Sequence, residues 1–415
     1  MPFRSLFSLF AYAAFGFPLA LVALPVYVYV PQFYVQRYGM SLGLIGAALL
    51  VSRLADACFD PWIGAQIDRR AAGHGFGRYI VIGLPFLAGG FFALFHPPEV
   101  SIGLVYVWFF ASLLLVYAGL SLASIAFQSW GAALTQAPGL RLRLTAAREF
   151  CGLFGVICAA GLAQLGDIDW LSAVFLLSLG LTAALLLRYT PTISNDQRAQ
   201  AASLTWSQLL GGRSFRVLLT VFIINGIAAA IPATLFLFFT KDKLQLGAYA
   251  GYLLLAYFLA AALSMPLWLR AAALWGEQRT WLIAMLASVA SFIWVYGLQA
   301  GDLTGFVVIC LISGMSLGAD LALPPALLAA LIHRAGHSGR YEGSYFGAWN
   351  WAAKMNLALA AGISLPLLDY FGYRPDSMVP AALQILTLGY ALLPCLLKGI
   401  AAAILWRIPL HPVRE

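Results

Sequence analysis

Residues 102–127 have the sequence IGLVYVWFFASLLLVYAGLSLASIAF and contain no charged side chain. A helix needs about 20 apolar residues to cross the hydrocarbon layer of a membrane, so this segment is long enough to span one. Comparable apolar segments lie at 79–95, 171–187 and 379–397. Of the 415 residues, 62% are hydrophobic and only 10% are charged, whereas soluble domains have about 25% charged residues. The sequence therefore predicts an all-α, multi-pass membrane protein.

The alternation of apolar segments and helix-breaking residues predicts about twelve transmembrane helices. The most polar stretch, Arg188–Arg216, separates the first half of these helices from the second. We therefore expect an N-terminal six-helix bundle over 1–190, a cytoplasmic linker over 191–213, and a C-terminal six-helix bundle with a short tail over 214–415. The expected helices lie near 8–31, 42–65, 79–96, 102–133, 145–165, 171–189, 215–240, 248–270, 280–298, 305–331, 344–368 and 379–406.

The distribution of charge predicts how the chain is oriented. Basic residues such as Arg78, Arg141 and Arg188 collect in one set of alternate loops, while the other set collects acids such as Glu99 and Asp302. Cytoplasmic loops carry the excess of Lys and Arg, so we expect both termini in the cytoplasm and the chain in the inner (plasma) membrane. The net charge of +8 does not indicate nucleic-acid binding, because the basic residues separate apolar spans instead of forming a stripe.

Three ionisable residues, Arg53, Asp56 and Asp60, fall within the second predicted helix. Their spacing places them on one face of that helix. Each charge at membrane depth costs about 2.5–3.5 kcal/mol, so such residues usually line a cavity or an ion path. Two neighbouring carboxylates repel each other unless a cation or a basic group compensates them, and hard cations prefer oxygen ligands. We hypothesise a cation site here. The alternative is a structural Arg53–Asp56 ion pair, with Asp60 accompanying the kink at Pro61.

Other ionisable residues also fall within predicted helices. Lys354 lies deep in the eleventh, where a carboxylate of the acidic pair would satisfy its charge better than a long reach to the membrane surface. Arg148 stands beside Glu149 near the start of the fifth, and both a functional role and a simple interface anchor are open for this pair. Asp320, in the tenth, has no evident partner in the sequence, and its role stays open.

The second predicted helix also carries a family resemblance. Residues 52–64 have the sequence SRLADACFDPWIG, which looks like helix 2 of the glycoside–pentoside–hexuronide:cation symporters, the melibiose-permease family of the major facilitator superfamily. The following Asp68-Arg69-Arg70 is similar to the Gly-x-x-x-Asp-Arg loop of major facilitators, which begins here at Gly64. The resemblance implies a major facilitator fold, in which two bundles alternately open a central site to either side of the membrane.

The resemblance implies a role for individual residues. Asp56 and Asp60 would coordinate the coupling sodium, lithium or proton, with Ser121 at the position of a hydroxyl ligand. Asp68 would hold the cytoplasmic gate, and we expect it to face the N-terminus of the eleventh predicted helix, where the helix dipole favours a carboxylate. The complete set of candidates is Asp56, Asp60 and Ser121 for the cation; Arg53, Tyr27, Ser124, Gln128, Arg148, Asn350 and Lys354 for substrate or coupling; and Gly64, Asp68, Arg69 and Arg340 for the gate.

The chain also departs from this family. Melibiose permeases grip sugar hydroxyls with acidic residues in helices 1 and 4, and those places are Pro18 and Ser124 here. A tryptophan beyond the second acid is Gln128. Because sugar recognition depends on such polar and aromatic contacts, these changes argue against a melibiose-like galactoside. Phe59 stands where an asparagine often accompanies the second aspartate, which makes proton coupling as plausible as sodium coupling.

We therefore predict a secondary active transporter and not an enzyme. By resemblance it would carry a small solute, a sugar or glycoside, in symport with Na⁺ or H⁺. The alternative is a lysolipid or other amphipathic-solute carrier of the same fold, because the family includes lysolipid carriers with this helix 2 motif. We expect no cofactor, no metal beyond a Na⁺ at Asp56 and Asp60, contact with membrane lipid, no nucleic-acid partner and a monomeric chain.

Overall fold

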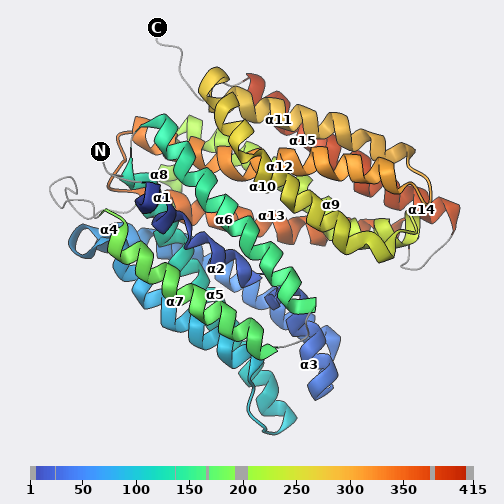
Figure 1. Ribbon diagram of the computed structural model, residues 1–415, viewed down its shortest axis with the longest axis horizontal. Helices are drawn as coiled ribbons and strands as arrows, with labels where there is room; N and C mark the ends of the chain where they lie inside the picture. The colour runs from blue at the N-terminus through green and yellow to red at the C-terminus, as the bar shows by residue number, and fades with distance from the viewer. Residues whose placement is uncertain are drawn as a thin grey trace. The chain divides into compact units, whose positions relative to one another are not determined.

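The structure is a computed structural model that describes residues 6–23, 25–135, 137–164, 168–191, 204–373 and 379–407. Within these ranges the regular structure is helical and there is no strand (Figure 1). Ten helices in the described part of the chain are long and apolar enough to cross a membrane. The expected all-α membrane protein is confirmed.

Most helices begin and end within a few residues of the expected positions. For example, the apolar pattern predicts a helix over 102–133, and α5 spans Ile102–Leu134. Short π and 3-10 turns, labelled η, extend or interrupt several helices. In chain order the elements are α1 (Leu6–Ala13), α2 (Gly16–Leu21), η1 (Pro25–Tyr29), α3 (Val30–Tyr38), α4 (Leu42–Phe95), α5 (Ile102–Leu134), α6 (Pro138–Gln164), α7 (Ile168–Tyr189), α8 (Trp206–Gly211), α9 (Arg213–Phe238), η3 (Phe239–Lys243), η4 (Gly247–Tyr249), α10 (Ala250–Trp275), α11 (Glu277–Phe292), η5 (Ile293–Gly297), α12 (Leu303–Arg334), α13 (Glu342–Tyr370), α14 (Pro380–Thr387), η6 (Leu388–Leu392) and α15 (Leu393–Arg407).

The first expected helix, near 8–31, is divided into several short helices. α2 contains Pro18, and Pro25 begins η1. Proline lacks the backbone N–H that a continuous helix needs, so both residues favour breaks. α3 continues to Tyr38, where Gly39 ends it with a φ of +63°, the left-handed conformation common at helix C-termini.

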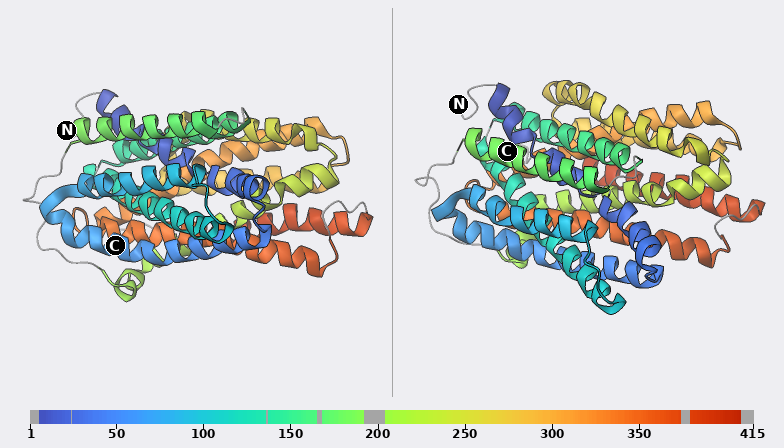
Figure 2. Two further views of the ribbon diagram at one scale, coloured as in Figure 1. Left: turned by 90° about the horizontal axis from the view of Figure 1, so that it is seen from below. Right: turned by 60° about the horizontal axis from the view of Figure 1, so that its bottom comes forward.

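α4 contains two helices joined by a sharp turn. Gly75 has a φ of +70° and a ψ of 164°, a conformation that residues other than glycine rarely adopt. The Tyr79 hydroxyl donates to the Gln66 carbonyl oxygen over 3.1 Å, although a straight helix would hold residues at this spacing about 20 Å apart. The chain therefore reverses direction within α4 (Figure 2). Its two parts correspond to the helices expected near 42–65 and 79–96.

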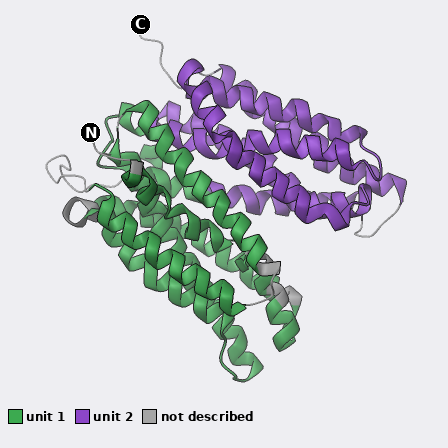
Figure 3. Ribbon diagram, in the orientation of Figure 1, with its two compact units in different colours: residues 1–209, 332–351 green, residues 210–331, 352–415 purple. Residues whose placement is uncertain are grey.

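The chain forms two compact units (Figure 3). Unit 1 contains Met1–Leu209 and Ile332–Trp351, and unit 2 contains Leu210–Leu331 and Ala352–Glu415. The sequence places the two bundles at 1–190 and 214–415. In the structure the first part of α13, through Trp351, packs with unit 1 instead of unit 2. Most of the expected linker, 192–203, lies outside the described residues.

Glycines allow helices of unit 1 to touch backbone to backbone. A Cβ at Gly90 would lie 2.7 Å from the backbone nitrogen of Val116, so the second part of α4 and α5 are in close contact. A Cβ at Gly155 would lie 2.3 Å from the carbonyl oxygen of Phe17, which packs α6 equally closely on α2. These contacts fix the positions of α5 and α6 against their neighbouring helices. α5 carries Ser121, and α6 carries Arg148.

Unit 2 has its own apolar core. α15 packs against α9 and α11, and the rings of Phe239 and Tyr390 stack with their centroids 4.1 Å apart. Large apolar side chains also face outward, and Leu263 is 74% exposed. Outward-facing apolar side chains suit a unit that is surrounded by lipid hydrocarbon.

Candidate functional site

The acidic pair of the second predicted helix is buried in unit 1. Asp56 and Asp60 lie on the first part of α4 and are 6% and 0% exposed. Arg53, one turn before Asp56, is half-buried. The Ser121 hydroxyl on α5 donates to Asp56 Oδ1 over 2.6 Å. The structure thus places a hydroxyl from a second helix against the carboxylate that the sequence selects.

The charges of this cluster determine what it is suited to bind. When both carboxylates are ionised, Arg53 supplies one positive charge against two negative charges, so the three side chains carry a net negative charge. Ionised carboxylates in an apolar interior are costly, and a cation bound beside them lowers that cost. Carboxylate and hydroxyl oxygens are the ligands that hard cations prefer. The cluster is chemically suited to a small cation.

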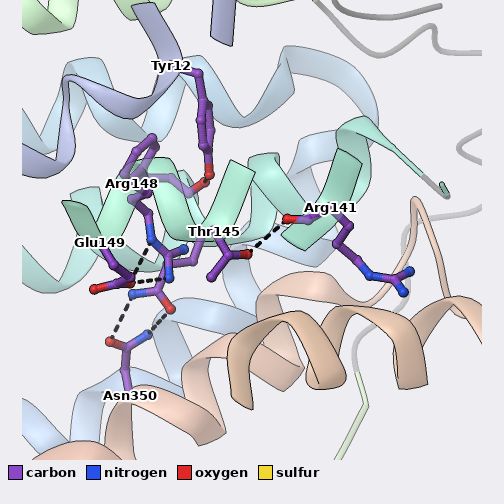
Figure 4. Close-up of polar contacts among 8 residues, drawn as sticks. Tyr12, Arg141, Thr145, Arg148, Glu149 and Asn350 are labelled. Carbon is purple, nitrogen blue, oxygen red and sulfur yellow. Dashed lines mark hydrogen bonds and ion pairs between the residues drawn. The ribbon is translucent and has the colours of Figure 1, made fainter. Parts of the chain in front are cut away.

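Arg148 on α6 forms a second polar cluster in unit 1 (Figure 4). Its Nε and Nη2 both donate to Glu149 Oε1, over 3.0 Å and 2.6 Å. The Tyr12 side chain on α1 also lies beside Arg148, and its hydroxyl donates to the Phe127 carbonyl oxygen over 3.2 Å. The cluster therefore joins α1, α5 and α6. Sequence reasoning missed Tyr12, because a tyrosine in an apolar helix is usually a packing or interfacial residue.

The amides of Gln128 and Asn350 lie together in the same unit (Figure 4 labels Asn350). They exchange two side-chain hydrogen bonds of 3.4 Å and 3.3 Å, which join α5 to the first part of α13. Asn350 is also fixed by a 2.8 Å bond to the Phe346 carbonyl oxygen. Ser124 lies one helical turn before Gln128 and is half-buried. The side chain of Tyr27 lies outside the described residues.

Asp68 belongs to α4, and its side chain contacts the start of α13. From the sequence, we expect Asp68 to face this helix. Its Oδ1 accepts the backbone N–H of Gly343 over 2.7 Å, and its Oδ2 accepts that of Ser344 over 2.6 Å. The Ser344 hydroxyl also donates to Oδ2. The first N–H groups of a helix lack partners within the helix and attract a carboxylate. Burial raises the pKa of Asp68 well above its usual range, while the hydrogen bonds from Ser344 and Gly343 oppose that rise.

Gly64 permits the contact between α4 and α13. A Cβ at Gly64 would lie 2.0 Å from the Gly343 carbonyl oxygen, and one at Gly347 would lie 2.6 Å from the Asp60 carbonyl oxygen. Only residues without side chains allow the two backbones to approach this closely. The other candidates for the gate, Arg69 and Arg340, are exposed.

Unit 2 contains a buried charged cluster that the sequence does not reveal. Lys398 Nζ on α15 donates to Asp320 Oδ2 over 2.6 Å, and both side chains are 9% exposed. Asp320 Oδ1 accepts Asn225 Nδ2 over 3.1 Å and Trp281 Nε1 over 2.8 Å. One carboxylate on α12 therefore connects α9, α11 and α15. The partner of Asp320 that is not evident in the sequence is Lys398, which lies on another helix.

Lys354 lies on the part of α13 that belongs to unit 2 and is half-buried. The acidic pair belongs to unit 1, so the expected pairing of Lys354 with Asp56 or Asp60 stays a prediction. Nearby on α13, Asn356 is buried and bonds the Phe222 carbonyl oxygen on α9 over 3.4 Å.

The chain matches the model of the family described as MFS/sugar transport protein over residues 9–412. It belongs to that family. As an MFS protein it is a multi-pass membrane transporter with the major facilitator fold, and it is not an enzyme. The membership in the major facilitator superfamily that the sequence predicts is confirmed.

Related MFS proteins include symporters and sugar transporters. The chain is 24% identical over 379 residues to the uncharacterized symporter YjmB of Bacillus subtilis (strain 168), a match that covers 85% of this chain and 81% of YjmB. It is 28% identical over 156 residues to the isoprimeverose transporter of Lactiplantibacillus pentosus, which covers 37% of this chain and 32% of that one. The fold is similar to the crystal structure of a bacterial ferroportin homologue in its outward-facing state, with a TM-score of 0.72, 13% identity, and coverage of 96% of this chain and 98% of that chain.

Proposed function

We propose that this MFS transporter is a symporter that couples the transport of a small sugar or glycoside across the inner membrane to that of Na⁺ or H⁺. The observation that carries the proposal is the 2.6 Å hydrogen bond from Ser121 to Asp56. With Asp60 one turn away and fully buried, it supplies oxygen ligands from two helices at a negatively charged position.

Coupling in this proposal follows from charge compensation. A cation bound at Asp56 and Asp60 neutralises carboxylate charge inside unit 1 and favours a conformation that the unbound protein disfavours, so binding and conformational change are linked. A carrier that changes conformation only when both sites are filled, or both are empty, moves the solute together with the cation.

The solute site in this proposal combines two groups of polar side chains in unit 1, the Arg148–Glu149 pair on α6 and the Gln128–Asn350 amide pair. Sugars are held by a small number of placed polar groups of this kind. The matching isoprimeverose transporter supports a glycoside as the first solute class to test. Lys354, Arg53, Ser124 and Tyr27 remain candidates for substrate contact or coupling.

The gate in this proposal is the contact of Asp68 with the start of α13. Three hydrogen bonds end on one carboxylate there, and they lie close to Gly64, where the two backbones touch. Cytoplasmic loops are rich in basic residues, and both termini are expected in the cytoplasm. Arg69 and Arg340 would therefore place this contact on the cytoplasmic side. Opening the inner side would then require that these three bonds break together.

The test is transport by the purified protein in lipid vesicles. Uptake of radiolabelled isoprimeverose is measured with an inward Na⁺ gradient, with an inward proton gradient, and with neither. We expect one gradient to drive accumulation and Asp56→Asn to abolish it while sparing exchange of solute across the membrane. Accumulation that persists unchanged in Asp56→Asn would remove the proposed coupling site. If lysolipids raise the thermal stability of the purified protein and none of the sugars does, the amphipathic-solute carrier is favoured instead.

A further inference from the structure

Glu149 is the acidic residue of the Arg148 cluster. The helices α1, α5 and α6 together contain no other Asp or Glu. Adjacent residues on a helix do not face each other, so the Arg148–Glu149 pair forms because the guanidinium turns along the surface of α6 toward its neighbour (Figure 4). The guanidinium lies beside Tyr12 and supports the Glu149 carboxylate with two hydrogen bonds.

The two oxygens of Glu149 are used very differently. Both donors of Arg148 end on Oε1, whereas Oε2 accepts no hydrogen bond from the residues that the structure describes. A carboxylate oxygen has two lone-pair sites for donors. The side chain is 24% exposed, against 9% for Arg148. An ionised carboxylate is costly in lipid hydrocarbon, so a carboxylate with this exposure is suited to polar surroundings.

The charge of the pair selects the kind of ligand. Arg148 already compensates Glu149, so the pair is neutral and does not require a charged solute. The open oxygen Oε2 accepts hydrogen bonds but donates none, which suits a hydroxyl donor. Hydrogen bonds to an ionised carboxylate are stronger than those between neutral groups. In the same unit, the Gln128–Asn350 bonds are long, at 3.4 Å and 3.3 Å, and a solute hydroxyl would replace them at little cost.

We propose that Glu149 is a specificity-determining residue whose Oε2 binds a hydroxyl of the transported sugar, with Arg148 as the positioning residue that holds the carboxylate. This inference rests on the proposed function and adds to it the substrate class: a neutral, polyhydroxylated solute rather than an anionic one.

The experiment measures isoprimeverose binding to the purified full-length protein by titration calorimetry. The variants are Glu149→Gln, which keeps the size of the side chain but removes its charge, and Glu99→Gln, the same change at an exposed loop position. We expect Glu149→Gln to weaken binding roughly 10–100-fold, the value of one charged hydrogen bond, and Glu99→Gln to leave it unchanged. Glu149→Asp, which keeps the charge and the Arg148 partner, should lose less than Glu149→Gln.

Monodeoxy analogues of isoprimeverose separate hydroxyl recognition from a purely structural role. One analogue should bind the wild-type protein at least tenfold more weakly than the parent sugar, yet bind Glu149→Gln as well as the parent does, because the hydrogen bond is already gone. Equal weakening of the parent and every analogue by Glu149→Gln would overturn the inference and leave Glu149 as the counter-ion of Arg148. Unchanged binding in Glu149→Gln would overturn the inference alone, whereas a wild-type protein that binds no sugar would overturn the proposed function with it.

Discussion

Lys398 on α15 donates to Asp320 on α12 over 2.6 Å, and the two charges are buried inside unit 2. Trp281 and Asn225 complete the hydrogen bonds of the Asp320 carboxylate. Removing one member of a buried ion pair leaves an uncompensated charge and costs about 3–5 kcal/mol, whereas replacing both by apolar groups is often neutral.

This pair predicts a specific pattern of stability. Lys398→Met should lower the thermal stability of the purified protein strongly, because the Asp320 carboxylate is then buried without its cation. Asp320→Leu combined with Lys398→Met should recover part of the loss, because the buried charge is gone while Asn225 and Trp281 lose their acceptor. The measurement is thermal unfolding in detergent, with tryptophan fluorescence as the signal. A double variant as unstable as Lys398→Met would contradict a pairwise interaction.

The Asp320–Lys398 pair also shows a limit of the sequence. A single lysine barely changes the hydropathy of a long apolar segment, so the span Pro380–Arg407, which ends in α15, is correctly predicted while the charge of Lys398 passes unnoticed. Nothing local to Asp320 indicates which helix faces it. The partner is set by tertiary packing between residues that are 78 positions apart. Hydropathy predicts where helices lie, but not which side chains meet across them.

The sequence is informative where chemistry is local. The spacing of Asp56 and Asp60 on one helix needs no tertiary information, and apolar length alone locates α5 and α7. The family resemblance predicts Ser121 as a hydroxyl ligand, and in the structure its hydroxyl donates to Asp56. Glu149 illustrates the opposite case. Its position beside Arg148 is evident in the sequence, but only the structure shows that both Arg148 donors end on one of its oxygens.

Ser121 provides a test of the cation site that leaves both aspartates intact. Ser121→Ala removes the hydroxyl that bonds Asp56 Oδ1, so we expect the cation concentration for half-maximal uptake to rise roughly tenfold with little change in stability. Ser129→Ala, on the same helix and equally buried, is the control and should leave the cation dependence unchanged. If both variants respond alike, the hydroxyl of Ser121 has no particular part in cation binding.

Gly64 provides a test of the contact between α4 and α13. Gly64→Ala would place a methyl group 2.0 Å from the Gly343 carbonyl oxygen, so the helices must separate at a cost of about 1–3 kcal/mol. We expect slower transport together with a lower melting temperature. Gly46→Ala is the matched control, because a Cβ there meets nothing within 4 Å. Equal behaviour of the two variants would show that the close approach is not needed.

Asp68 provides a direct test of the bonds at the start of α13. Asp68→Asn replaces one acceptor oxygen by an NH₂ group, which is unable to accept from Gly343 or Ser344. One of the two backbone N–H groups then loses its partner, and the first turn of α13 should open more often. The measurement is hydrogen–deuterium exchange, in which we expect peptides covering 342–346 to exchange at least about tenfold faster, a loss of roughly 1.4 kcal/mol of protection. Asp169→Asn, at a carboxylate that is 88% exposed, should leave those peptides unchanged. Unaltered exchange in Asp68→Asn would mean that the first turn of α13 is held by its own packing, and Asp68 would then lose its proposed part in the gate.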